Sequence, residues 1–461
     1  MLWRTWQRTA ARFPDQPVVI EADSGRVWTC AELTQAAERL ALAEFGVAAS
    51  ASERISRSSA RSRSRLQHAA KRGMVTAFCL PNGGEWVVRF LACQRAGVRA
   101  APLDPSLDGE ALAGAARQLT AASPAFRVQR SQKMPSDAVC CLKITSGTSG
   151  QMTTVPCRAR HLLADGRQII ASMGLRPRDR NLAIIPLGHS YGLGNLVLPL
   201  VLEAIPIVCT QGLVPRHLLE VIDRHRVTVL PTVPAVLRAL ALTAGAKRPA
   251  ALRLVISAGA PLSAEVARQF HRTFGLKIHN FYGASETGGI CYDRSGGATL
   301  TGRSLGRPLL GVTVRVRRDG RVVVRSAAVA VGRGQQVLPD QGEWNRFGEL
   351  RLLGRVGRVA NIGGRKVVPA ELENCLRTVA GIADAWVTVL QDRHHRDYLA
   401  AAVETTRSRE ELEGELARHV AAWKLPKRWW LQPRLPRTER GKLDTAALVR
   451  SLSGEPKVTG G

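Results

Sequence analysis

The stretch from Ile144 to Gly150 (ITSGTSG) contains seven residues without a charge or a large side chain, and it follows the apolar run 138–142. Such a sequence predicts a short strand that ends in a loop whose backbone N–H groups are free to bind one external object. Clustered amides and hydroxyls form an anion-binding concavity, so we interpret the stretch as a phosphate-binding loop. It is not a Walker loop, because Gln151 stands where that motif requires lysine. A flexible surface loop is the alternative interpretation.

Three further apolar segments, at 181–186, 252–257 and 277–281, also run into loops of small residues. Helical patterns separate these segments, and strands that alternate with helices are typical of α/β folds. Because the carboxyl ends of parallel strands meet at one edge of a sheet, we expect the loops to gather into one ligand site.

Two changes of pattern divide the chain. From residue 299 onward, short alternating strands predict a small β-rich subdomain, and after Gly354 a compact α+β pattern begins. We therefore predict an α/β fold with a large N-terminal domain over residues 1–354, built of layered, mostly parallel sheets and the β-rich subdomain. A small α+β C-terminal domain follows over residues 355–461. Two domains also agree with the length, since 461 residues exceed what one hydrophobic core normally supports.

Residues 48–72 are rich in serine and arginine, including the run SRSSARSRSR. This composition buries little apolar surface and predicts a disordered surface insertion. The alternative is an RNA-binding arm, which the net charge of +29 also favours. Arginine is spread over nearly every segment, however, so a compositional bias explains the charge more simply and we expect no nucleic-acid partner.

The nine cysteines are scattered without a Cys-x-x-Cys pair, which indicates buried thiols in a reducing compartment. The N-terminal residues 1–6 lack the pattern of a signal peptide, and no run of 18 apolar residues occurs. We expect a cytoplasmic protein without a membrane span.

Four motifs together resemble the acyl-adenylate-forming superfamily, which includes acyl-CoA synthetases, peptide-synthetase adenylation domains and luciferases. They occur in the family's order: the loop at 144–150, YGASE at 282–286, Gly354-Arg355, and PRTERGK at 436–442. The resemblance runs from the turn at 13–15 to Asp444 and so covers nearly the whole chain. Each motif alone is weak, but four in the correct order and spacing are specific. The resemblance implies that the C-terminal domain is a mobile lid, with a hinge at Gly357.

The resemblance implies an ATP site built from several loops. Its phosphate ligands are Thr145, Ser146, Gly147, Thr148, Ser149 and Gly150. Its adenine and ribose ligands are Gly259, Ala260, Pro261, Asn280, Tyr282, Gly283, Asp340 and Arg355. Asp340 lies in a degraded form of the family's Thr-Gly-Asp triplet, and a core role for Tyr282 is the alternative.

The catalytic residues implied by the resemblance are Glu286, Ser285, Lys442 and His189. A lone acid beside a phosphate site is electrostatically reasonable when it holds Mg²⁺, which is the implied role of Glu286. Ser285 offers a hydroxyl to the α-phosphate, and Lys442 stabilises the forming bond between carboxylate and α-phosphorus. His189 resembles a gate between the acyl pocket and the thiol tunnel, with a helix-start histidine as the alternative.

The chain departs from the family pattern in several places, including Gly357-Arg358, which replaces an acidic pair, and two places around the phosphate loop. Met152-Thr153-Thr154 replaces Pro-Lys-Gly after the phosphate loop, which removes a cation near the pyrophosphate. The region 104–143 is also shorter than in the family. Restoring the lysine by Thr153→Lys is expected to speed adenylation only if its loss is a handicap.

The expected function is that of an AMP-forming acid–thiol ligase, with ATP, Mg²⁺ and CoA as cofactors. The segment 187–195 holds no acid to pair a substrate ammonium, so a fatty or aryl carboxylate fits better than an amino acid. One alternative is an acyl-AMP ligase that loads the phosphopantetheine of an acyl carrier protein, which a basic surface suits. Another is a non-catalytic binding protein with the same fold.

Overall fold

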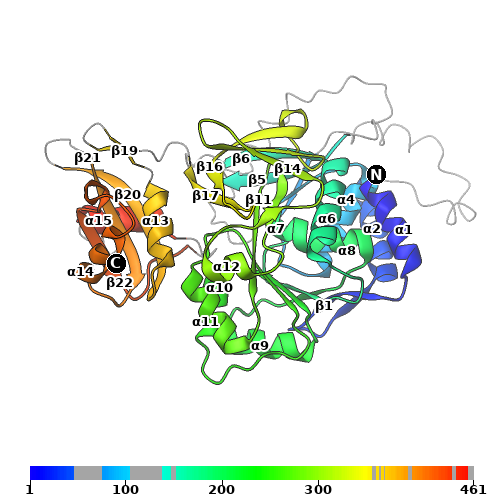
Figure 1. The fold of residues 1–461 in the computed structure, drawn as a ribbon. Coiled ribbons are helices and arrows are strands. Elements are labelled where there is room, and N and C mark those ends of the chain that lie inside the picture. The colour runs from blue at the N-terminus through cyan, green and yellow to red at the C-terminus, as the bar shows by residue number, and fades with distance from the viewer. Residues whose placement is uncertain are drawn as a thin grey trace, which may run out of the picture.

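The computed structural model describes residues 1–45, 75–103, 138–146, 152–355, 360–362, 365–367, 369–392, 397–438 and 443–454. The predicted Ser/Arg-rich insertion at 48–72 lies outside these residues. Figure 1 shows the C-terminal strands and helices as a body beside the remaining elements.

The largest sheet has nine strands in the order β13-β12-β11-β10-β9-β7-β8-β1-β2. Its central strands from β11 to β1 are parallel, and β2, β12 and β13 join antiparallel at the edges. The strands are β1 (Pro17–Glu21), β2 (Val27–Thr29), β7 (Asn181–Ala183), β8 (Ile207–Cys209), β9 (Val229–Thr232), β10 (Leu254–Ser257), β11 (Ile278–Ala284), β12 (Gly288–Tyr292) and β13 (Arg307–Pro308).

A hydrophobic core lies on each face of this sheet, because successive side chains of a strand point to opposite faces. Val208 belongs to one core, while its neighbours Ile207 and Cys209 belong to the other. The core that contains Val208 packs against α9 (Pro215–Arg224), α10 (Pro234–Ala241) and α11 (Ala264–Phe274). The opposite core includes residues of α1 (Leu2–Arg12), α2 (Cys30–Phe45), α4 (Gly84–Ala96), α6 (Ala159–Met173) and α8 (Leu198–Glu203).

A second sheet has the order β3-β4-β5-β6, with β3, β4 and β5 parallel and β6 antiparallel to β5. Its strands are β3 (Val75–Phe78), β4 (Arg99–Pro102), β5 (Val139–Ser146) and β6 (Met152–Arg158). Strands β5 and β6 form the two arms around the predicted phosphate loop, and Thr145 pairs with Thr153 at the loop end.

The predicted β-rich subdomain is an antiparallel sheet in the order β14-β15-β16-β17. Its strands are β14 (Val312–Val316), β15 (Arg321–Ser326), β16 (Gln335–Trp344) and β17 (Leu350–Arg355). The short helix α12 (Gly297–Thr301) precedes it. Together these sheets confirm the predicted α/β fold with mostly parallel layers.

The C-terminal elements have their own hydrophobic core. They are β18 (Ala360–Ile362), β19 (Arg365–Val367), α13 (Pro369–Thr378), β20 (Ile382–Gln391), β21 (Asp397–Thr405), α14 (Arg409–Ala417), β22 (Arg428–Gln432) and α15 (Thr445–Ser453). Strands β20 and β21 pair antiparallel, and β22 joins β21 parallel. The predicted domain boundary near 355 stays a prediction.

Polar contacts join the C-terminal elements to the rest of the chain. The Asn374 amide of α13 donates to the Leu352 carbonyl of β17 at 2.7 Å. Arg238 of α10 forms an ion pair with Glu404 of β21, whose side chain is fully buried. Arg437 contacts the same carboxylate at 2.7 Å and Asp384 at 2.9 Å, so arginines from both parts of the chain neutralise Glu404.

The apolar segment 181–186 forms a shorter strand than we predicted, since β7 ends at Ala183. The Asn82 side chain replaces strand pairing beyond this point. Its amide donates to the carbonyls of Ala183 and Ile185 at 2.8 and 2.9 Å, and its oxygen accepts from Leu187 N–H at 2.9 Å. The apolar stretch after it forms α7 (Ser190–Gly192), a π-helical turn (Leu193–Val197) and α8.

Among the described residues, every helix is too short or too polar to cross a membrane.

Candidate functional site

The strand β11 leads directly into the turn that holds Ser285 and Glu286, and β12 returns from that turn. Gly283 pairs with Gly289 across the two strands, and a β-carbon at Gly283 would lie 2.8 Å from the Gly288 carbonyl oxygen. Glycine is therefore required at 283 for the close approach of the strands. The Glu286 carbonyl accepts a hydrogen bond from Ala330 N–H at 2.9 Å, which ties the turn to the β-rich subdomain.

Ser285 and Ser190 bring two loops together. Their hydroxyl oxygens are 2.7 Å apart, although the residues are 95 positions apart in the sequence. Ser190 begins α7, so the loop after β7 and the loop after β11 meet at the carboxyl edge of the large sheet. This is the meeting of loops that the parallel strands predicted.

The Tyr282 hydroxyl donates a hydrogen bond to Asp340 Oδ2 at 2.7 Å. Tyr282 is a predicted adenine contact at the end of β11, and Asp340 is the predicted ribose ligand on β16. Asp340 also lies opposite Arg355 in the pairing of β16 with β17. The tyrosine, the aspartate and the backbone of the second predicted ribose contact therefore lie together, while the Arg355 side chain lies outside the described part.

The adenine loop 259–261 follows β10, which is parallel to β11. Asn280 is buried and lies opposite Ser257 in this pairing, and its N–H donates to Thr299 Oγ1 at 3.0 Å. Gly259 has a φ of +84°, a left-handed conformation that favours glycine. The predicted adenine residues therefore share the carboxyl edges of two adjacent strands.

His189 caps the start of α7, where its Nδ1 accepts a hydrogen bond from Tyr191 N–H at 3.2 Å. This contact is the helix-start role that we gave as the alternative. A gating role stays a prediction.

Several predicted residues fall outside the described residues: Gly147, Thr148, Ser149, Gly150, Gly357 and Lys442. The backbone of Thr145 and Ser146 ends β5, but their side chains are not described. The structure thus places the strand ends on either side of the phosphate loop.

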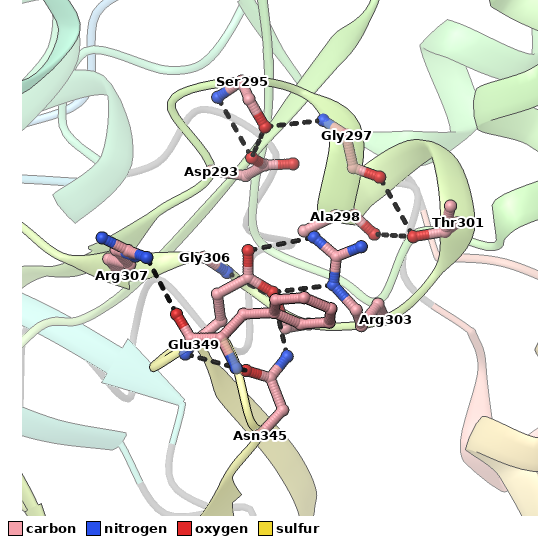
Figure 2. A network of polar contacts seen from close by, with 12 residues as sticks. Asp293, Ser295, Gly297, Ala298, Thr301, Arg303, Gly306, Arg307, Asn345 and Glu349 are labelled. Atoms are coloured by element: carbon pink, nitrogen blue, oxygen red, sulfur yellow. Dashed lines mark hydrogen bonds and ion pairs between the residues drawn. The ribbon is translucent and has the colours of Figure 1, made fainter.

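A separate polar network holds the hairpin of β16 and β17 that carries Asp340 and Arg355 (Figure 2). Glu349, just before β17, forms an ion pair with Arg303 through two hydrogen bonds of 2.9 and 3.0 Å. It also accepts from Asn345 at 2.9 Å and from Ser304 at 2.8 Å. The Arg303 hydrogen bonds, with smaller effects of Asn345 and Ser304, lower the Glu349 pKa from its ordinary 4.5 to about 2 against the opposing effect of burial.

The lowered pKa of Glu349 predicts a pH-dependent contribution to stability. A carboxylate whose folded pKa lies below its unfolded value stabilises the fold above the unfolded pKa. We expect Glu349→Gln to lower the free energy of unfolding by about 1–3 kcal/mol near neutral pH. The difference from wild type should disappear as the pH falls from 4.5 to about 2. Denaturant unfolding over this pH range measures the difference in free energy of unfolding. Glu343→Gln, which breaks an exposed ion pair with Arg351, is the control. A loss of stability in Glu349→Gln that does not change with pH would contradict the expectation.

The Tyr282–Asp340 contact yields a second prediction. Tyr282→Phe removes the hydroxyl that fixes the Asp340 carboxylate, and a hydrogen bond to a charged group contributes about 1.5–3 kcal/mol. We expect the KM for ATP to rise roughly 10-fold with little change in kcat, because the contact orients a binding residue. Steady-state kinetics at varied ATP concentration measures the change. Tyr398→Phe, in β21, is the matched control, and an unchanged KM in Tyr282→Phe would show that the contact does not support ATP binding.

The sequence interpretation missed two buried charges near this site. Lys143 of β5 is 3% exposed and Asp165 of α6 is also 3% exposed. Asp165 Oδ1 accepts a hydrogen bond from Gly289 N–H at 2.9 Å, directly after the turn with Glu286. A lysine within an otherwise apolar strand was the available signal for the first, whereas Asp165 lies in an ordinary amphipathic helix pattern.

Comparison with known proteins agrees with this arrangement. The family described as AMP-binding enzyme matches residues 115–332, and the AMP-binding enzyme C-terminal domain matches residues 371–442. Together the two matched regions cover more than half of the chain, and the second begins near the start of α13.

Curated relatives include 3-[(3aS,4S,7aS)-7a-methyl-1,5-dioxo-octahydro-1H-inden-4-yl]propanoyl:CoA ligase of Mycobacterium tuberculosis, which is 27% identical over 66% of this chain and 64% of that protein. The chain thus matches less than two thirds of that relative's length. The 2-succinylbenzoate–CoA ligase of Bacillus subtilis is 25% identical over 84% of this chain and 90% of that protein.

Two solved structures of the o-succinylbenzoate CoA synthetase of Bacillus subtilis have the same fold. The complex with an acyl-adenylate intermediate has a TM-score of 0.77 at 22% identity, covering 96% of this chain and 97% of that one. The complex with ATP and magnesium has a TM-score of 0.76 at 22% identity, covering 95% and 98%. The motifs, the fold and the two family matches agree, and the chain belongs to the AMP-binding enzyme family of acyl-adenylate-forming proteins.

Proposed function

We propose that the protein is an AMP-forming acid–thiol ligase, which activates a carboxylate with ATP and transfers the acyl group to a thiol. The hydrogen bond between Tyr282 and Asp340 carries the proposal, because it joins a predicted adenine contact to a predicted ribose ligand. The turn with Ser285 and Glu286 follows β11, which carries Tyr282, and Ser285 contacts Ser190 at the start of α7. The contacts among these proposed ligands of the base, the sugar and the phosphate support the proposal.

The chemistry requires two anions to react. A carboxylate oxygen of the substrate forms a bond to the α-phosphorus of ATP, the bond from that phosphorus to the bridging oxygen breaks, and pyrophosphate leaves. The chain's groups position the reactants and neutralise charge. In the second step the thiol sulfur forms a bond to the acyl carbon, AMP leaves, and the thiol proton is released.

Glu286 fits a role in holding Mg²⁺ together with the ATP phosphates. Mg²⁺ prefers oxygen ligands and is commonly held by one or two carboxylates plus substrate phosphates. Within the part of the chain that the structure describes, no group of three His, Cys, Asp or Glu side chains forms a metal site by itself. A single carboxylate such as Glu286 suits an arrangement in which the ATP phosphates supply the other oxygen ligands. The bound ion would neutralise charge on the phosphates as pyrophosphate leaves.

The substrate is proposed to be a fatty or aryl carboxylate. The segment 187–195 is largely buried and contains no aspartate or glutamate. A substrate ammonium placed there would lack a counter-ion from this segment, and an unpaired buried charge is costly. The relatives named above are CoA ligases, which supports CoA as the acceptor.

Exchange of labelled pyrophosphate into ATP tests the first step. We expect exchange that depends on a carboxylate, across a panel of fatty and aryl acids at fixed Mg²⁺. No exchange with any acid of the panel, from protein that is folded, would overturn the proposal in favour of a non-catalytic binding protein.

The acceptor is tested by adding CoA or a carrier protein to a reaction that shows exchange. The net charge of +29 favours an acidic carrier protein as the second candidate acceptor. Acyl-CoA formation supports the proposed ligase, whereas acylation of the carrier phosphopantetheine alone would identify an acyl-AMP ligase.

A further inference from the structure

Lys143 lies on the buried face of the hairpin formed by β5 and β6. It pairs with Val155, and the next pair on the same face, away from the loop, is Cys141 with Cys157. All four side chains are at most 4% exposed. Lysine is seldom buried to this degree unless its charge has a partner. Its presence among two thiols and a valine therefore requires an explanation.

Two carboxylates act on Lys143 electrostatically, and one of them is the predicted Mg²⁺ ligand. They are Asp165, on α6, and Glu286, in the turn after β11. Burial acts to lower the Lys143 pKa, while Cys157, Asp165, Cys141 and Glu286 act to raise it, and the net shift is upward. His161, also on α6, has its pKa lowered to about 4, mainly by burial, and is neutral near pH 7. Lys143 therefore stays charged, with carboxylates on two elements.

Lys143 forms no close ion pair with a carboxylate of the described residues. Among the residues that the structure describes, no carboxylate lies within 4.0 Å of its ammonium, although this distance would define a salt bridge. The carboxylate of Asp165 is instead bound to Gly289 N–H at 2.9 Å. The ammonium is thus near two acids and remains available to another anion.

The strand register places Lys143 on the same face of the hairpin as position 153, where the family has a lysine. Opposite residues of an antiparallel pair point to the same face, so Lys143, Val155 and Thr153 share one face of the hairpin. Thr153 is exposed and lies two residues closer to the phosphate loop than Val155. Diagonal neighbours of this kind lie about 7–8 Å apart, which is within reach of long side chains. A lysine ammonium from 143 and one from 153 can therefore serve the same region.

We infer that Lys143 supplies, from the strand before the phosphate loop, the positive charge toward the ATP phosphates that the family pattern places after the loop at 153. The inference rests on the proposed function, since it assigns a ligand to that site. It also explains how the chain keeps a cation there although Thr153 cannot provide one. Thr153→Lys alone should then change ATP affinity little, because the charge is already present.

A simpler role for Lys143 is to neutralise Asp165. The two roles make different predictions when Asp165 is changed as well. If Lys143 serves only Asp165, removing both charges leaves nothing to compensate and the effect of losing Lys143 disappears. If Lys143 serves the phosphates, its loss weakens ATP binding whether or not Asp165 is charged. The comparison of Asp165→Asn with Asp165→Asn/Lys143→Met separates them.

The experiment measures the Kd of MgATP by isothermal titration calorimetry. The proteins are wild type, Lys143→Met, Asp165→Asn, and the two double variants Asp165→Asn/Lys143→Met and Lys143→Met/Thr153→Lys. Methionine keeps the length of the side chain and removes its charge. We expect Lys143→Met to raise the Kd roughly 10- to 100-fold, as for a lost charged hydrogen bond to a phosphate. The same factor should separate Asp165→Asn from Asp165→Asn/Lys143→Met, and Thr153→Lys should restore most of the affinity of Lys143→Met. Thermal unfolding verifies that each variant is folded.

Three results would overturn the inference: an unchanged Kd in folded Lys143→Met, a loss that vanishes in the Asp165→Asn background, or a loss that Thr153→Lys does not restore. Pyrophosphate exchange by wild type distinguishes these failures from failure of the proposed function. If wild type neither binds ATP nor exchanges pyrophosphate, both the proposed function and the inference are overturned. If wild type exchanges pyrophosphate but Lys143→Met binds MgATP with an unchanged Kd, only the inference is overturned.

Discussion

Glu286→Gln is expected to reduce carboxylate-dependent pyrophosphate exchange roughly 100- to 1,000-fold, the effect of removing one group that stabilises charge in the transition state. Glutamine keeps the size of the side chain and removes the negative charge that suits Mg²⁺. The turn itself should persist, because its backbone is held by Ala330 N–H and by the pairing of Gly283 with Gly289. A loss of activity without a loss of stability therefore identifies a role in the reaction.

Titration with Mg²⁺ makes this test specific. We expect Glu286→Gln to need a higher Mg²⁺ concentration for half-maximal exchange, with a smaller maximum rate. Glu343→Gln is the matched control, since Glu343 is an exposed acid of β16 that pairs with Arg351 at 3.3 Å. If Glu286→Gln exchanges pyrophosphate within about threefold of wild type, the carboxylate does not hold the metal.

Lys442→Met is expected to reduce adenylation roughly 100- to 1,000-fold while sparing the thiol step. Lys442 lies outside the described residues, but the chain on either side of it is held. Arg437 pairs with Leu443 in an isolated β-bridge and forms ion pairs with Asp384 and Glu404. The described residues on both sides of Lys442 are thus held by the C-terminal elements, which supports a lysine presented from a fixed place.

The two half-reactions separate the roles of Lys442. Pyrophosphate exchange reports adenylation, and acyl-CoA formation from a synthetic acyl-adenylate reports the thiol step alone. We expect the first to fall in Lys442→Met and the second to stay near the wild-type rate, because the predicted role of the lysine is confined to the bond between carboxylate and α-phosphorus. Lys427→Met, at an exposed lysine before β22, is the control. Equal losses in both half-reactions would indicate a general effect on the fold, and no loss would indicate a solvated surface lysine.

Local sequence was sufficient to predict the fold class and many of the elements that carry the site. Apolar segments followed by small residues predicted β10 and β11, and parallel strands bring their carboxyl ends to one edge. This geometry explains why residues at the ends of separate segments were expected in one site. The same reasoning failed for the segment 181–186, because its polar partner, Asn82, comes from a distant part of the chain and ends the strand at Ala183.

The charges inside the molecule were less accessible to sequence reasoning. Glu404 lies near the end of β21, whose residues from Leu399 to Thr405 are all buried, and its side chain is neutralised by Arg238 and Arg437. Arg437 was considered only as part of the terminal lysine motif. An ion pair depends on the packing of whole elements, and such packing has no local pattern.

The sequence by itself determined the family, the order of the motifs and the residue types available to bind ATP, since these follow from local composition and spacing. Only the tertiary structure decided that Tyr282 donates to Asp340, and that Lys143 shares the face of Thr153 near Glu286. The first contact joins residues 58 positions apart, and the second depends on the register of β5 with β6. Contacts of this kind arise when the strands and helices pack, because a shift of one residue in a strand would turn each of its side chains to the opposite face.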